Sequence, residues 1–289
     1  MTVLSEKTAT FLSPDGVKIF YRHYPAKFER GRMVIAHGLG EHSGRYGNVI
    51  ERMHSQGISV WLPDHRGHGQ SEGKRGHILN FTQFLMDLRL AVELAKDDLP
   101  EAMRCFLMGH SMGGLMAIYF AQRFPELIDG VIASSPCLGM ASEVPAVKAV
   151  IGSLMSYIWP GLTMGNGLDA TKLSHDPDVF SGYKNDPLVH DRVSARFFTE
   201  LIAAMESVYQ QASKLNVPIL LQIAGDDHLV SARCSKKFFN ELVLQDKTLH
   251  IYEGLYHEIY NELQDHRNRV FTDMENWLEK HLLAISNEK

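Results

Sequence analysis

The sequence predicts an α/β fold with a mostly parallel central sheet, helices on both faces and an inserted helical cap. Three observations lead to this expectation. Short apolar runs alternate with helical patterns along most of the chain, which is typical of parallel strands joined by helices. One apolar run leads into a serine set between glycines. The alternation then stops for about fifty residues and resumes before the last third of the chain.

The first predicted element is a hairpin, and six further strands and three helices follow it. Thr8–Leu12 and Val17–Tyr24 flank the turn residues Ser13 to Gly16. We then expect strands at Met33–Ala36, Ile58–Leu62, Cys105–Met108, Val131–Ala133, Ile219–Ile223 and Thr248–Tyr252. Helical spacing of apolar residues indicates helices at Phe81–Ala95, Leu115–Phe124 and Phe271–Leu282.

The break in the alternation predicts the domain organisation. We assign residues 1–136 and 190–289 to the core and residues 137–189 to the cap. In open α/β sheets an insert after a strand lies over the carboxyl ends of the strands, where ligands bind. Within it, Val144–Met164 has the length of a membrane span. We interpret it as an amphipathic helix, because it contains Lys148 and is broken at Pro160 and because its apolar residues form one stripe: Val144, Val147, Ile151, Leu154, Met155 and Ile158.

Composition excludes some classes of protein. The 289 residues carry a formal net charge of −5, which gives no basic surface for nucleic acid. Three cysteines are too few for a disulfide framework and fit a reducing compartment. The segment Met1–Lys7 lacks the apolar stretch of a signal peptide. We therefore expect a cytoplasmic protein, peripheral at membranes where the cap touches them.

Gly109-His110-Ser111-Met112-Gly113 is the most informative segment. A serine between glycines, directly after a strand and before a helix, is typical of the nucleophile elbow of an α/β-hydrolase. Small neighbours are needed because the turn is sharp and crowded. Ser111 is therefore the predicted nucleophile.

A serine hydroxyl needs a histidine base and an acid that orients the base. In this fold the chain order is Ser, then Asp or Glu, then His. Asp226 and Asp227 follow a predicted strand, and Asp227 is the better candidate because a turn begins there. His257 lies in the loop between the last strand and the last helix, and is the predicted base.

The oxyanion of the reaction needs two backbone N–H donors. Met112, the residue after the nucleophile, supplies one. Leu39, in the glycine-rich loop that begins at His37 after a strand, is the predicted second donor.

Histidines at positions 37, 42, 65 and 68 raise the question of a metal site. We expect no metal and no cofactor, because glycine-rich packing around turns explains these segments and no set of carboxylates completes a site.

Together these residues resemble the monoglyceride lipase and lysophospholipase group of α/β-hydrolases, over nearly the whole chain. The similar segments are His37–Tyr46, Asp64–Gly73, Gly109–Gly114, Asn185–Leu188 and Ile251–His257. The resemblance implies a triad of Ser111, Asp227 and His257 with Leu39 and Met112 as oxyanion donors. It also implies that Glu41, Arg45 and Tyr183 lie near the polar head of the substrate, although an ion pair that braces the loop is an equally good explanation of Glu41 and Arg45. Leu39 stands where the family often has a small residue.

The expected function is cleavage of a monoacylglycerol to fatty acid and glycerol through an acyl-enzyme. A single-chain lipid ester is the expected partner, with transient membrane or micelle contact through the cap. The alternatives are a lysophospholipase, a general carboxylesterase, an aminopeptidase, and a non-catalytic binding protein of the same fold.

Overall fold

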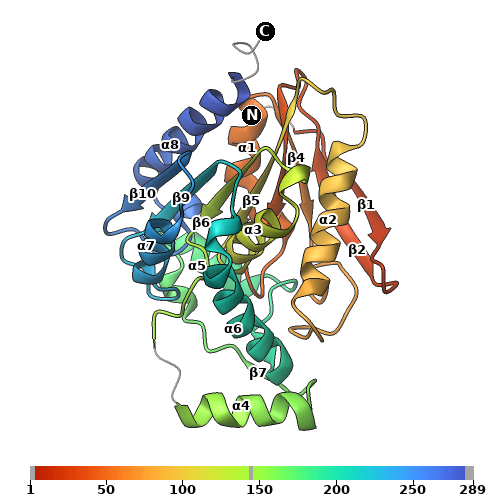
Figure 1. Cartoon of the computed structure of the whole chain (residues 1–289), viewed down its shortest axis with the longest axis vertical. Coiled ribbons are helices and arrows are strands. Elements are labelled where there is room, and N and C mark those ends of the chain that lie inside the picture. The colour runs from red at the N-terminus through yellow and green to blue at the C-terminus, as the bar shows by residue number, and fades with distance from the viewer. Residues whose placement is uncertain (1–3, 143–145, 284–289) are drawn as a thin grey trace.

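The computed structural model describes residues 4–142 and 146–283 and has an eight-stranded sheet at its centre (Figure 1). The strand order is β1-β2-β4-β3-β5-β6-β9-β10. All neighbours from β4 to β10 are parallel, while β1 and β2 are antiparallel at one edge. The predicted α/β-hydrolase fold is confirmed. The strand bounds are β1 Lys7–Leu12, β2 Lys18–Tyr24, β3 Gly31–Ala36, β4 Ile58–Pro63, β5 Arg104–His110, β6 Gly130–Ser134, β9 Ile219–Ala224 and β10 Lys247–Tyr252.

The two faces of the sheet are covered by different helices. Alternate strand residues such as Val34 and Leu107 pack with α2, α3, α6 and α7 on one face. Their neighbours, such as Met33 and Met108, pack with α1 and α8 on the other. Strands buried on both faces read as continuous apolar runs, which is why the sequence pattern located them well. The helices are α1 Gly47–Ser55, α2 Thr82–Lys96, α3 Met112–Arg123, α6 Ala195–Gln210, α7 Ala232–Glu241 and α8 Gln264–Leu283.

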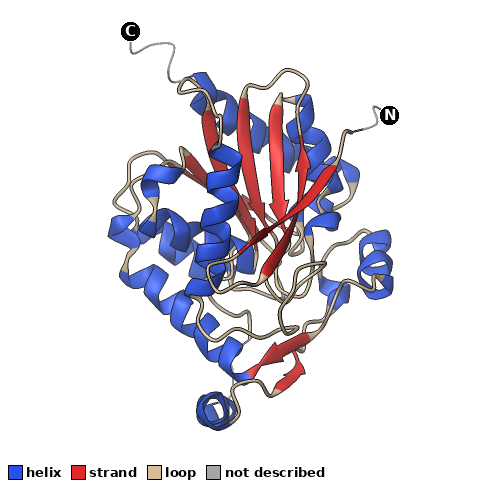
Figure 2. Cartoon of the chain, turned by 90° about the vertical axis from the view of Figure 1, so that its right-hand side faces the viewer, coloured by secondary structure: helices blue, strands red, loops and turns tan. Residues whose placement is uncertain are grey.

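The segment between β6 and α6 extends beyond the sheet (Figures 1 and 2). It contains α4 Ala146–Ile158, β7 Thr163–Gly165, α5 Pro177–Asn185 and β8 Arg192–Ser194. β7 pairs with β8, from Thr163 opposite Ser194 to Gly165 opposite Arg192. The strand structure of this segment thus continues past residue 189, and the cap bounds 137–189 stay a prediction.

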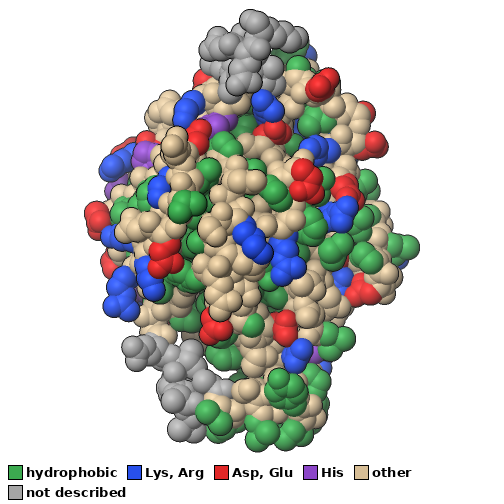
Figure 3. Space-filling model, in the orientation of Figure 1, with side chains coloured by type: hydrophobic (Ala, Val, Ile, Leu, Met, Phe, Trp, Pro, Cys, Tyr) green, Lys and Arg blue, Asp and Glu red, His purple; other side chains and the backbone are tan. Residues whose placement is uncertain are grey.

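Helix α4 does not bury its apolar stripe. Ile151, Leu154 and Ile158 are exposed, whereas Ser156 on another side of the helix is buried and α4 packs along α6. Apolar side chains gather on the surface around α4 (Figure 3). Val144 lies outside the described residues, as does the side chain of Val147. Among the described residues, no helix combines the length and the apolar character that a membrane crossing requires.

Candidate active site

Ser111 lies at the sharp turn between β5 and α3. Its φ of 56° is in the left-handed region, and its N–H donates to the Ser134 carbonyl. The glycines of the elbow have no room for a side chain. A Cβ on Gly109 would lie 2.0 Å from the carbonyl oxygen of Gly113, and one on Gly113 would lie 2.0 Å from that of Ala36. These contacts explain why small residues surround the predicted nucleophile.

His257 and Asp227 form a buried pair beside the elbow. Nδ1 of His257 lies 2.7 Å from an oxygen of Asp227, and the other oxygen accepts from the N–H groups of Leu229 and Val230. Burial opposes charge on His257, but the Asp227 carboxylate outweighs it and raises the pKa of His257. Asp226, the alternative acid, is exposed and faces His228 instead.

Ser111 and His257 line one cavity of about 570 Å³. No hydrogen bond joins the Ser111 hydroxyl to His257 among the described residues. In enzymes without substrate such bonds are often long and tighten only when substrate binds. The structure therefore brings the three predicted triad residues together: His257 contacts Asp227, and Ser111 and His257 line the same cavity.

The loop after β3 supplies the second predicted oxyanion donor. Gly38 approaches the nucleophile closely, since a Cβ there would lie 3.4 Å from Cβ of Ser111. The Gly38 N–H donates to Oε1 of Glu41 at 2.6 Å, which fixes the next peptide of the loop. Met112 is the first residue of α3, so its N–H has no partner within the helix. Leu39 and Met112 both line the cavity.

Residues just before α6 hold this loop from the cap side. The Gly40 carbonyl accepts from the His190 N–H at 2.8 Å, and Nε2 of His42 lies 2.9 Å from Asp186. Nδ1 of His42 accepts from the Gly44 N–H, so Nε2 carries the proton and donates to Asp186. A Cβ on Gly40 (φ 79°) would lie 2.3 Å from the His190 carbonyl oxygen. Sequence reasoning missed these contacts, because they join segments about 150 residues apart.

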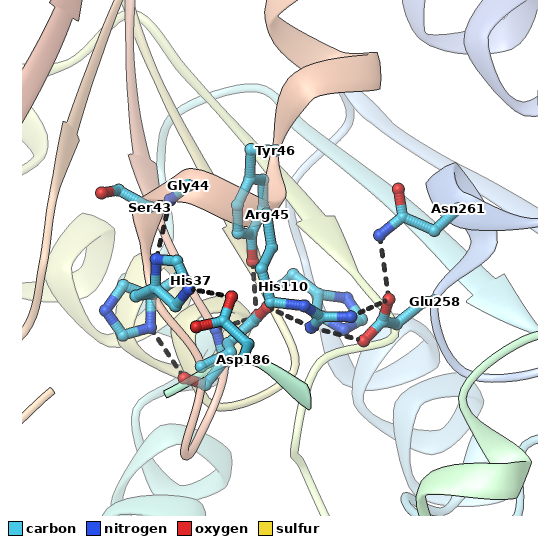
Figure 4. Close-up of polar contacts among 12 residues, drawn as sticks. His37, Ser43, Gly44, Arg45, Tyr46, His110, Asp186, Glu258 and Asn261 are labelled. Atoms are coloured by element: carbon cyan, nitrogen blue, oxygen red, sulfur yellow. Dashed lines mark hydrogen bonds and ion pairs between the residues drawn. The ribbon is translucent and has the colours of Figure 1, made fainter. Parts of the chain in front are cut away.

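A buried ion-pair cluster forms the wall next to His257. The Arg45 guanidinium donates to Glu41 at 2.7 Å and to both oxygens of Glu258 at 2.8 and 3.0 Å. The Tyr46 hydroxyl donates to Glu41, and the Asn261 amide donates to Glu258. Figure 4 shows Arg45 between Tyr46 and Glu258, with Asn261 on the far side of Glu258.

The sequence-predicted head-group residues all belong to this wall. Glu41, Arg45 and Tyr183 line the cavity, and the Arg45 guanidinium lies 4.8 Å from the centre of the Tyr183 ring. Burial disfavours the charge of Arg45, but Glu258 and Glu41 raise its pKa. Burial likewise opposes ionisation of Glu41, yet Arg45 lowers its pKa. The loop-bracing ion pair therefore exists, on residues that also face the cavity.

Glu258 was missed at the level of sequence. Its signal was its position directly after the predicted base, where a carboxylate on a buried loop requires a cationic partner. The partner, Arg45, lies 213 residues away, so local pattern could not identify it.

The wall of the cavity combines a polar group of residues with a larger apolar group. Glu41, Arg45, His110, Tyr183 and Glu258 form the polar group, and a smaller cavity of about 280 Å³ shares four of these residues. Besides Gly38, Ser111 and His257, the rest of the wall is apolar and comprises Leu39, Met112, Cys137, Met140, Leu168, Leu173, Leu201, Leu229 and Val230.

A cluster of buried histidines packs at the start of the loop after β3, which carries Leu39 and is called the oxyanion loop below. The rings of His37 and His65 are 3.9 Å apart, and those of His68 and His190 are 4.6 Å apart. Burial lowers the pKa of His37 to about 3 and lowers those of His65 and His68. Nε2 of His37 accepts from the His65 N–H and so is occupied. Within residues 4–142 and 146–283, no group of three or more ligand side chains is arranged to hold a metal ion.

Comparisons of the sequence and of the structure with known proteins all find α/β-hydrolases. The profile of a family described as "Serine aminopeptidase, S33" matches residues 28–264. A monoacylglycerol lipase of Mycolicibacterium smegmatis is 34% identical over 275 residues, covering 94% of this chain and 97% of the relative. The phospholipase YtpA of Bacillus subtilis is 37% identical, covering 83% and 94%. The crystal structure of Paleococcus ferrophilus monoacylglycerol lipase superposes with a TM-score of 0.81 at 34% identity, covering 96% of this chain and all of that one.

Proposed function

This chain belongs to the monoglyceride lipase and lysophospholipase group of α/β-hydrolases and is a carboxylic ester hydrolase, and we propose that it cleaves monoacylglycerols through an acyl-enzyme on Ser111. The observation that carries the proposal is the buried His257–Asp227 pair, whose histidine lines the same cavity as the elbow serine.

In the proposed mechanism His257 removes the proton of Ser111 as the hydroxyl oxygen attacks the ester carbonyl. The N–H groups of Leu39 and Met112 donate to the oxyanion that forms. His257 then gives the proton to the leaving glycerol oxygen, and the acyl group stays on Ser111. Water, deprotonated by His257, releases the fatty acid. Asp227 holds the imidazole with Nε2 toward the serine throughout.

The polar and apolar residues of the wall fit the two halves of such a substrate. His257 must reach the leaving oxygen, so the glycerol lies on the side of His257 and of its neighbour Glu258. The acyl chain then lies along the apolar residues of the wall, which include Met140 and Leu201. Apolar walls with a few polar groups at one end are common in lipid-binding pockets.

Aminopeptidase activity is a less favoured function for the same catalytic residues. In such an enzyme the terminal residue becomes the acyl group, so its ammonium would lie at the acyl end of the cavity. That end is apolar, whereas the carboxylates of Glu41 and Glu258 stand at the leaving-group end and are paired with Arg45. A buried ammonium without a partner would be strongly unfavourable.

We further propose that the cap contacts membranes through the exposed face of α4 and the residues that follow it. The exposed side chains are Val150, Ile151, Leu154, Tyr157, Ile158, Trp159 and Met164. An amphipathic helix of this kind inserts its apolar side at the lipid interface. With a net charge of −5 the attraction is apolar, not electrostatic. The free thiols of Cys105, Cys137 and Cys234 support the expectation of a cytoplasmic, reducing environment.

Tryptophan fluorescence tests the membrane contact. Trp61 and Trp277 are buried and Trp159 is exposed, so Trp159 reports on the cap. Neutral phosphatidylcholine vesicles should shift its emission to shorter wavelength, and the Trp159→Phe variant should lose that shift. No shift in the wild-type protein would contradict the contact.

Initial rates test the activity itself. The substrates are 1-monooleoylglycerol, an oleoyl lysophosphatidylcholine and a short nitrophenyl ester, with Ser111→Ala as the blank. We expect the highest kcat/KM on the glyceride, complete loss in Ser111→Ala, and labelling of Ser111 by a fluorophosphonate. Preference for the lysophospholipid would change the substrate and keep the mechanism. Equal rates in wild type and Ser111→Ala would overturn the mechanism.

A further inference from the structure

We propose that Glu258 is a specificity-determining residue: it gives the leaving-group end of the cavity an excess negative charge that excludes phosphate-bearing substrates. This inference rests on the proposed function and names the substrates that the same site accepts. The accepted class is an ester of an uncharged, hydroxylated alcohol, and the rejected class carries a phosphate on that alcohol.

The first step is the position of Glu258 relative to the reaction. The base that protonates the leaving oxygen is His257, and Glu258 follows it in the chain. Glu258 lines both the larger cavity that contains Ser111 and the smaller polar cavity beside it. Its side chain is only 4% exposed. Substituents of the leaving alcohol therefore come close to this carboxylate.

The second step is that two carboxylates already use three of the five N–H donors of Arg45 and compensate its charge. Arg45 is the cation among the residues that line the two cavities. One terminal nitrogen donates to both Glu41 and Glu258, and the other donates to Glu258. The ring of Tyr183 lies over the guanidinium. A phosphate that displaced these carboxylates would break a buried bidentate pair and leave a carboxylate without its partner.

The third step is the charge balance. Two carboxylates, Glu41 and Glu258, share one guanidinium, so the cluster carries one excess negative charge. His110 is next to the cluster, and burial lowers its pKa to about 4, so it stays neutral and adds no compensating charge at neutral pH. At roughly 7 Å and an effective dielectric constant of about 20, one like charge weakens binding by more than tenfold.

Glycerol hydroxyls meet a different environment. The carboxylate oxygens of Glu41 and Glu258 accept hydrogen bonds, and the Tyr46 hydroxyl and the Asn261 amide also face this end. An uncharged polyol can donate to these acceptors without any charge repulsion. Discrimination between the two classes thus follows from the arrangement of charges around one guanidinium.

A matched pair of substrates tests the proposal. 1-Decanoylglycerol and 1-decanoylglycerol 3-phosphate differ by the phosphate alone, and both are used as monomers. For the wild-type enzyme we expect kcat/KM to favour the glyceride by about 100-fold or more. Glu258→Gln keeps the shape and an acceptor for Arg45 but removes the charge, and should narrow the preference by about tenfold. Rates on p-nitrophenyl decanoate, which has no charged head, report any general loss of catalysis.

Glu253→Gln is the matched control, because it removes one carboxylate from an exposed position five residues earlier on the same segment. It should leave the preference as in the wild type. An unchanged preference in Glu258→Gln, or the same narrowing in Glu253→Gln, would overturn the assignment. So would comparable wild-type rates on the two substrates.

A second measurement needs only the wild-type enzyme, in case Glu258→Gln does not fold. The second pKa of a phosphate monoester is about 6, so its charge falls between pH 8 and pH 5.5. Protonation of His257 lowers kcat/KM equally for both substrates, so it cancels in their ratio. As pH falls, the preference for the glyceride over the phosphate ester should therefore become smaller. A constant ratio contradicts the proposal. Fluorophosphonate labelling and nitrophenyl ester hydrolysis test the serine mechanism separately.

Discussion

The backbone of Ser111 is the most constrained feature at the residue scale. Its φ of 56° is costly for any residue with a Cβ, by about 1–3 kcal/mol. Glycine normally destabilises a folded protein relative to alanine because it gains more freedom on unfolding. At position 111 we expect the opposite order: Ser111→Gly should melt about 3 °C above Ser111→Ala, as measured by differential scanning calorimetry.

Ser55, an exposed residue in the last turn of α1, provides the control pair. There Ser55→Ala should melt above Ser55→Gly, as expected for a helical position. If alanine were also the more stable residue at position 111, the elbow would not be strained.

With His257 as the proposed base, its protonation should set the acid limit of activity. Asp227 raises the pKa of His257 above the ordinary value of 6.5, and the neutral imidazole is the form that acts as base. As pH falls, kcat/KM on a soluble nitrophenyl ester should therefore decline with a midpoint above 6.5. Asp227→Asn should lower the rate by up to about 10⁴-fold, because the tautomer is no longer fixed.

The profile is measured between pH 5 and pH 9 at constant ionic strength. Circular dichroism at each pH shows that the protein is folded where the rate is recorded. A midpoint below 6.5 in folded enzyme would contradict the assignment of His257 as the base.

At the scale of elements, the oxyanion loop depends on the cap segment that holds it. Asp186→Ala removes the acceptor of the His42 proton and of the Leu188 N–H. The loop that carries Leu39 then loses one of its supports, so kcat on a soluble ester should fall about tenfold. The Michaelis constant should change by less than about twofold, because the walls of the cavity remain.

Asp191→Ala is the matched control, since Asp191 is exposed and pairs loosely with Arg192. Its kinetics should equal those of the wild type. A rise in KM at unchanged kcat in Asp186→Ala would show that this contact shapes the pocket and does not support the oxyanion donor.

Sequence reasoning worked best where a pattern is local. The buried strands and the elbow were predicted within one or two residues, because a two-sided burial or a crowded turn limits which residues can occur there. Strands β7 and β8 have three residues each and no periodicity to detect. Glu258 and the partners of Gly40 depended on contacts between distant segments.

Helix α4 illustrates a further limit. Residues 146–158 form a helix, as the periodicity predicted, but periodicity identifies only a face of a helix and not what lies against it. The structure packs Ser156 inward and leaves Leu154 exposed. Which side of such a helix faces the protein is decided by the small residues that allow close approach to α6.

At the scale of the whole molecule, the buried histidines make stability depend on pH. The unfolded chain binds a proton on each histidine near pH 6.5, while folded His37 binds one only near pH 3. Between these values the unfolded state holds more protons, so stability falls as pH falls. For His37 alone the loss at pH 5 is about 2 kcal/mol, measurable by urea unfolding at pH 7 and pH 5.

His68 provides the test of this explanation. His68→Gln should reduce the difference in stability between pH 7 and pH 5, whereas the exposed His266→Gln should leave it unchanged. If the stability of both variants depended on pH equally, the loss of stability at acid pH would not come from His68.

Helix α6 packs both on the central sheet and on the segment that lies between β6 and α6. Its residues Phe197 and Val208 are part of the core beside the sheet, and α4 packs along it. An exchange of the segment before α6 for that of a relative would therefore have to keep the packing of α4 on α6 and the contacts of Asp186 and His190 with the loop after β3. In evolutionary terms, we expect this segment and the core that it contacts to change together at these positions, while its exposed residues, such as Ile151 and Met164, vary independently.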